Sequence, residues 1–119
     1  MTVGIVGSRS ITEPIPEGII PERISLILSG GAKGTDRSAR QYALKHNILI
    51  EEILPAYDLY GKRAPLIRND IIIDRSDKIF IFWDGKSRGT KYVINQCIKK
   101  NKPYDLYVLK NGVFSYLEH

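Results

Sequence analysis

The fold class is decided by residues 78–83, which read Lys78-Ile79-Phe80-Ile81-Phe82-Trp83. Aromatic and β-branched residues favour strands, and a run that is apolar on both faces is typical of the buried middle of a parallel sheet. Four other short apolar runs resemble it, at residues 2–6, 24–29, 48–54 and 104–109. We therefore expect five strands.

Residues with helical spacing separate most of these runs. Apolar side chains recur every three or four residues from Ala39 to His46, from Pro65 to Asp74 and from Val93 to Ile98. Three prolines leave room for only a short helix at residues 17–23, and residues 57–62 look like a loop. The alternation predicts an α/β, Rossmann-like doubly wound and mainly parallel five-stranded sheet. The dipeptide at 111–112, Asn-Gly, predicts a C-terminal hairpin that adds residues 113–116 as an edge strand.

Composition narrows the class of protein. The chain has 119 residues with 43% apolar and 26% charged residues, which predicts one globular domain over residues 1–116, with 117–119 as a purification-tag remnant. No apolar run is long enough to span a membrane, and no secretory signal is apparent, so we expect a cytoplasmic protein. One cysteine and two histidines cannot supply a zinc site of ordinary spacing, and we expect no metal and no required cofactor. The net charge of +5 is compatible with phosphate-bearing partners and equally with a basic surface of no special role.

Three glycine-rich loops follow the first, second and fourth expected strands. Parallel strands end at one edge of a sheet, where helix N-termini and glycine-rich loops bind anions. Each loop alone is weak evidence, because tight turns also require glycine. Together they predict a nucleotide-like anionic ligand, held by Gly7, Ser8, Arg9, Ser29, Gly30, Gly31, Lys33, Gly34, Thr35, Asp36, Gly85, Ser87, Gly89 and Thr90, with Arg68 and Asn69 from the helix between. The loops match neither the P-loop pattern nor the Gly-x-Gly-x-x-Gly fingerprint, which disfavours P-loop hydrolases and ordinary NAD enzymes.

Charged residues in these loops have alternative roles. Asp84 follows the central strand and is our candidate catalytic carboxylate, although a turn or capping role is equally compatible. Asp36 could orient a ribose or base, but we favour a helix N-cap, which Thr35 could also provide. Arg68 could bind phosphate bidentately or form a surface ion pair with Asp70 or Asp74.

Two other side chains are expected in the core. Trp83 could stack on a base, yet strand alternation favours packing beside Ile79 and Ile81. Cys97 has helical spacing with apolar neighbours, so we expect it to be buried and inert.

The order of these motifs resembles the YspA-like branch of the SLOG superfamily, which also contains DprA and the Lonely Guy phosphoribohydrolases. The likeness rests on Gly7-Ser8-Arg9, on the segment 28–36, on Pro55-Ala56, Tyr60-Gly61-Lys62 and Ile67-Arg68-Asn69, and on the segment 82–90. It covers nearly the whole chain. The resemblance implies a compact Rossmann-like domain that binds a nucleotide or nucleotide derivative, in a sensing or processing role.

The resemblance leaves the reaction open. Lonely Guy enzymes carry Pro-Gly-Gly-x-Gly-Thr-x-x-Glu, and counting from Thr90 puts the glutamate position at Val93, which cannot act as acid or base. Our first hypothesis is therefore a ligand-binding module, followed by an N-glycosidic hydrolase that uses Asp84. A DprA-like single-stranded nucleic-acid binder is third, because the basic residues are scattered. The resemblance also makes a homo-oligomer plausible.

Overall fold

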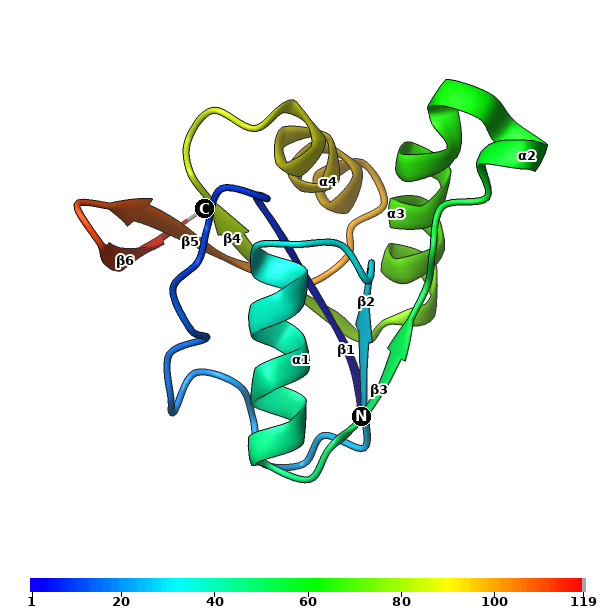
Figure 1. Ribbon diagram of the computed structural model, residues 1–119. Coiled ribbons are helices and arrows are strands. Elements are labelled where there is room, and N and C mark those ends of the chain that lie inside the picture. The colour runs from blue at the N-terminus through cyan, green and yellow to red at the C-terminus, as the bar shows by residue number, and fades with distance from the viewer. Residues whose placement is uncertain (119) are drawn as a thin grey trace.

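A computed structural model describes residues 1–118 and shows an α/β fold built on one six-stranded sheet (Figure 1). The strand order is β3-β2-β1-β4-β5-β6, with the first five strands parallel and β6 antiparallel to β5. The strands are β1 (Thr2–Gly7), β2 (Leu26–Ser29), β3 (Leu49–Glu52), β4 (Lys78–Trp83), β5 (Tyr104–Lys110) and β6 (Val113–Leu117). The helices are α1 (Thr35–Lys45), α2 (Tyr57–Tyr60), the 3-10 helix η1 (Gly61–Arg63), α3 (Ala64–Arg75) and α4 (Arg88–Lys99).

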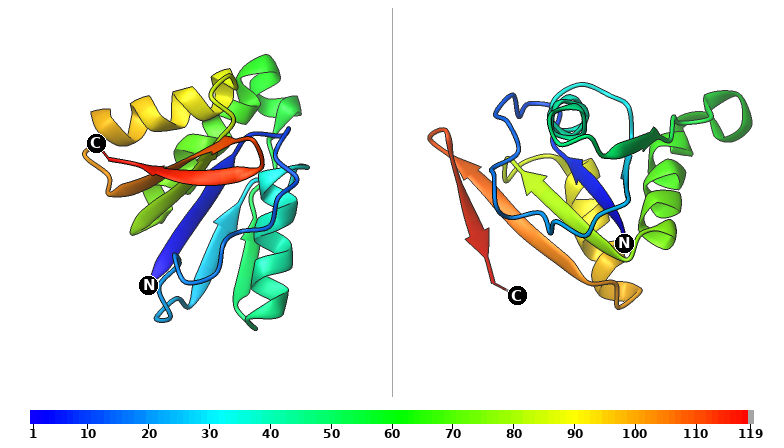
Figure 2. Two further views of the ribbon diagram at one scale, coloured as in Figure 1. Left: turned by 90° about the vertical axis from the view of Figure 1, so that its left-hand side faces the viewer. Right: turned by 90° about the horizontal axis from the view of Figure 1, so that it is seen from below.

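Helices cover both faces of the sheet. On one face α1 packs Ala39, Tyr42 and Ala43 against side chains of β1, β2 and β4. On the other face α3 and α4 contribute a second cluster that includes Ile72 and Cys97 (Figure 2). The central strands β1 and β4 have four consecutive buried residues each, because they contact both clusters. This α/β sheet is compatible with a Rossmann-like fold.

The sheet has six strands instead of five, because the edge strand expected from the hairpin at residues 111–112, β6, pairs with β5 in the same sheet. Asn111 and Gly112 both adopt positive φ, 52° and 75°, as this tight turn requires. Strand β6 runs to Leu117, so this residue pairs with Leu106 instead of lying outside the domain. His119 of the expected tag remnant lies outside the described residues.

Two local predictions were wrong. Residues 17–23 form no helix, and the segment from 8 to 25 crosses the first face as irregular chain anchored by three buried isoleucines, Ile11, Ile15 and Ile20. Residues 57–62 are not a simple loop, because they form α2 and begin η1. None of the side chains of α2 is buried, and this turn projects beyond α3 (Figure 1).

Candidate functional site

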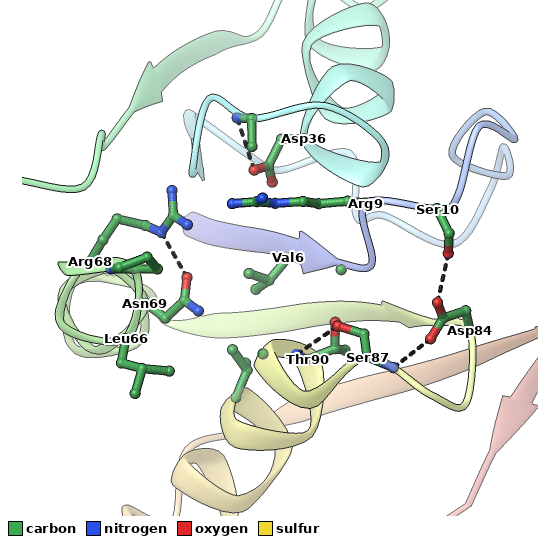
Figure 3. A pocket seen from close by; sticks show the side chains of 15 residues that line it. Val6, Arg9, Ser10, Asp36, Leu66, Arg68, Asn69, Asp84, Ser87 and Thr90 are labelled. Atoms are coloured by element: carbon green, nitrogen blue, oxygen red, sulfur yellow. Dashed lines mark hydrogen bonds between the residues drawn. The ribbon is translucent and has the colours of Figure 1, made fainter. Parts of the chain in front are cut away.

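A cavity of about 340 Å³ opens where β1 and β4 end. These two strands are neighbours at the point where the strand order reverses, so the loops that follow them separate and leave a crevice. Most predicted loop residues meet here: Gly7, Arg9, Asp36, Arg68, Asn69, Asp84, Ser87, Gly89 and Thr90 all line the cavity (Figure 3).

Eight other predicted site residues lie outside the cavity lining. Ser8 and Thr35 are buried beneath it, where the Thr35 hydroxyl donates to the Ser8 carbonyl. Gly85 lines a neighbouring groove instead. The rest are Ser29, the last residue of β2, and Gly30, Gly31, Lys33 and Gly34 in the loop between β2 and α1.

Arg68 is held in the cavity wall by the fold. The side chain comes from α3, is 6% exposed, and donates from Nη1 to the Gly30 carbonyl at 2.8 Å and from Nε to Asn69 Oδ1 at 2.9 Å. A Cβ atom at Gly30 would lie 2.8 Å from both Arg68 Cζ and Asp36 Oδ2, so only glycine permits this approach. The alternative of a surface ion pair with Asp70 or Asp74 was wrong.

Asp36 has a carboxylate oxygen without a partner. It is 7% exposed, and Oδ2 accepts from the Ala32 amide at 3.1 Å, whereas Oδ1 has no hydrogen bond within residues 1–118. Burial raises the pKa of Asp36, against the lowering effects of the Ala32 amide and the Arg68 charge. Ser29 Oγ also lowers this pKa, yet it makes no hydrogen bond of ordinary geometry to the carboxylate.

The N-cap role predicted for Asp36 or Thr35 was wrong. Gly34 is the N-cap of α1, with φ at 73°, and no side chain caps this helix. A Cβ atom at Gly34 would lie 2.6 Å from Arg9 Cα, so glycine is needed there for space as well as for conformation.

Arg9 carries the exposed positive charge of the cavity. Its side chain extends past Asp36 towards Arg68 (Figure 3), and no hydrogen bond or ion pair involves its guanidinium within residues 1–118. Burial lowers the pKa of Arg68, Asp36 opposes that effect, and the nearby Arg9 charge lowers this pKa further. Two guanidinium groups thus face one partly satisfied carboxylate, which leaves room for an anionic ligand.

Asp84 organises the loop before α4. Its Oδ1 accepts from the amides of Lys86 and Ser87, each at 2.8 Å, and its Oδ2 accepts from Ser10 Oγ at 2.6 Å. Burial would raise the pKa of Asp84, but these hydrogen bonds outweigh it and hold the pKa at about 2. Both oxygens are therefore engaged and the group stays ionised, which favours the turn role over general-acid chemistry.

The first turn of α4 forms the opposite wall. Ser87 is the N-cap and accepts from the Thr90 amide, and the Thr90 hydroxyl lies 3.3 Å from that of Ser8. A Cβ atom at Gly89 would meet nothing within 4 Å, and its φ is not in the positive range. Neither packing nor backbone conformation explains this glycine, whereas a ligand that approaches the helix N-terminus would.

Six further residues line the cavity that were not predicted to bind a ligand: Ser10 and Ala32 within the glycine-rich loops, Val93 on α4, and Val6, Pro65 and Leu66, which no motif indicated. Val6 is the residue before the last of β1 and Pro65 is the second residue of α3, so their positions in these elements were the only signal. Val93, at the position of the Lonely Guy glutamate, gives the wall an apolar side chain.

Within residues 1–118 no cluster of histidine, cysteine or acidic side chains could hold a metal ion, and no helix is long and apolar enough to cross a membrane. Comparison of the chain with protein-family models, with curated proteins and with solved structures finds no match.

Proposed function

We propose that this protein binds a nucleotide or nucleotide-derived ligand in the cavity between β1 and β4. The observation that carries the proposal is that one cavity is lined by the unpaired Arg9 guanidinium, by the helix N-terminus at Gly89 and by Asp36, whose buried Oδ1 has no partner within residues 1–118. This proposal assigns the sheet to the Rossmann-like, doubly wound class and places the chain in the YspA-like branch of the SLOG superfamily.

The three groups suit different parts of a nucleotide. Backbone amides of a helix N-terminus and an arginine fork bind phosphate, so the phosphate belongs at Gly89 and Arg9. Asp36 Oδ1 is buried in the cavity wall, and a ribose hydroxyl or base N–H that reached it would donate the hydrogen bond that it lacks. Arg68 acts through Gly30 and Asp36, because its Nε and Nη1 already donate to Asn69 and Gly30.

A binding role has more support than glycosidic-bond hydrolysis. Val93 offers no carboxylate at the position that the Lonely Guy resemblance requires, and the Asp84 carboxylate is occupied by three donors. Of the two carboxylates in the cavity lining, only that of Asp36 is then left for hydrolysis.

The proposal is tested by thermal unfolding with AMP, ADP-ribose, NAD and cyclic mono- and dinucleotides. A ligand at 100 times its Kd should stabilise the folded protein by about 2.7 kcal/mol. Arg9→Gln should lower the affinity at least tenfold, because a charged hydrogen bond contributes roughly 1.5–3 kcal/mol. Arg9 is exposed, so the fold should remain intact.

Arg37→Gln is the matched control, because Arg37 is exposed on α1 and does not line the cavity. It removes the same charge and should leave the affinity within twofold of wild type. Equal stabilisation of the Arg9 and Arg37 variants by the ligand would overturn the site assignment, and stabilisation by none of the compounds would overturn the function.

A further inference from the structure

A second groove lies against the outer side of the segment that walls the first cavity. Its volume is about 450 Å³, and it is lined by Trp83, Gly85, Lys86, Arg88, Lys91, Tyr92 and Asn95. Asp84, Ser87, Gly89 and Thr90 of the same segment line the first cavity. The loop after β4 and the first turn of α4 therefore separate two neighbouring hollows.

The groove gathers positive charge without compensation. Lys86, Arg88 and Lys91 line it, no carboxylate does, and none of the three forms an ion pair within residues 1–118. Arg88 and Lys91 also lie in the first turn or so of α4, which has no acidic residue. Cations are unfavourable at this positive end of the helix dipole, so Arg88 and Lys91 lower the stability of the free protein. A bound anion removes this cost.

Trp83 gives the groove a fixed aromatic wall. The indole Nε1 donates to the Ser87 carbonyl at 3.1 Å, and the ring packs against the cluster that contains Ile79 and Ile81, as expected. The ring is nevertheless only partly buried, and Lys91 Nζ lies 5.5 Å from its centroid. An indole fixed in this way can stack with a planar base, while the flexible lysine turns to the accompanying phosphate.

We propose that this groove binds the second nucleoside of a dinucleotide-type ligand whose first nucleotide occupies the cavity between β1 and β4. The inference rests on the proposed function. The second base stacks on Trp83, and the phosphate that links the second nucleoside to the first is bound by Lys86, Arg88 and Lys91. The linkage passes over the first turn of α4, where Gly89 has no side chain to obstruct it.

The protein carries its own probe for this test, because Trp83 is its single tryptophan. The experiment titrates the protein with each of the four 5′-mononucleotides and with the four 5′-phosphorylated homodinucleotides, pNpN. Affinity is measured by calorimetry and Trp83 emission by fluorescence, with free N-acetyltryptophanamide as the control for light absorption. We expect one dinucleotide to bind at least tenfold more tightly than its mononucleotide and to quench Trp83, whereas the mononucleotide leaves the emission unchanged.

The double variant Lys86→Gln/Lys91→Gln separates the two grooves. It should weaken the dinucleotide about tenfold and change mononucleotide affinity by less than threefold. Lys99→Gln, on the last turn of the same helix, should change neither. Equal affinity for mono- and dinucleotide, no quenching by the dinucleotide, or equal loss for both ligands in the double variant would overturn the second groove and leave the first site standing. Binding of neither ligand to the wild type would overturn both.

Discussion

Gly89 occupies a helix position where the protein itself has no need of glycine. The space around a Cβ atom is open for 4 Å, and glycine in a helix costs roughly 0.5–1 kcal/mol relative to alanine. By contrast, Gly30 and Gly34 cannot carry a Cβ atom without contacts of 2.8 Å or less. Gly89 is thus the glycine of the three loops that a ligand explains best.

Gly89→Ala should therefore change stability and binding in opposite directions. We expect the free energy of unfolding to rise by about 0.5–1 kcal/mol and the affinity for the stabilising nucleotide to fall severalfold, because the methyl group enters the space of the phosphate. Urea denaturation of the free protein and calorimetry with that nucleotide measure the two effects. An alanine variant that binds as well as wild type would remove the ligand explanation for this glycine.

Asp36 and Asp84 should have opposite effects on the pH dependence of stability. The pKa of Asp84 is lowered to about 2, so its stabilising contribution is complete above pH 4 and is lost as the pH falls towards 2. The pKa of Asp36 is raised by burial, so its ionised form costs stability, and this cost is relieved as the pH falls through the raised pKa. The unfolding free energy of wild type minus that of Asp84→Asn should decrease as the pH falls. The unfolding free energy of wild type minus that of Asp36→Asn should increase over the same range. Chemical denaturation between pH 7 and pH 3 measures both slopes, and slopes of equal sign would contradict the assignment.

The segment from 8 to 25 replaces a helix on the first face of the sheet. Its prolines at 14, 16 and 21 forbid a continuous helix, as the sequence indicated, but three isoleucines still bury their side chains. The backbone amides of this segment, unlike these side chains, have few partners in the protein. Apart from turns at residues 17–18 and 22–23, no backbone–backbone hydrogen bond within residues 1–118 involves the amides from 13 to 24. This element is therefore held by its side chains.

Hydrogen exchange should distinguish this element from the strands that it covers. We expect the amides of residues 15 and 20 to exchange quickly, although Ile15 and Ile20 are only 5% exposed, because no backbone acceptor protects them. Amides of Ile5 and Phe80 should exchange slowly, since both lie in paired central strands. Mass spectrometry of exchanged peptides measures both, and equal protection of the two regions would show that this segment has backbone hydrogen bonds after all.

For the molecule as a whole, the sequence predicted the α/β class and the loops but not the exact site. The apolar run 78–83 has four consecutive buried residues, as its composition requires. The glycine loops converge, because the carboxyl ends of parallel strands must meet at one edge. Asp36 was misassigned because a cap depends on the φ of Gly34, which no pattern reveals. Val6 and Leu66 were missed because an apolar wall residue looks like any other core residue in a sequence.

The two edges of the sheet are protected unequally. On β3 the outer residues include Glu51 and Glu52, which pair with arginines from α3 and α1. The other edge is β6, whose five residues read VFSYL and carry no charge. An exposed, uncharged edge strand can pair with the same strand of another molecule. We therefore expect the protein to aggregate in concentrated solution through edge-to-edge pairing of β6. Ser115→Lys should oppose this pairing, because it places a charge on the edge strand.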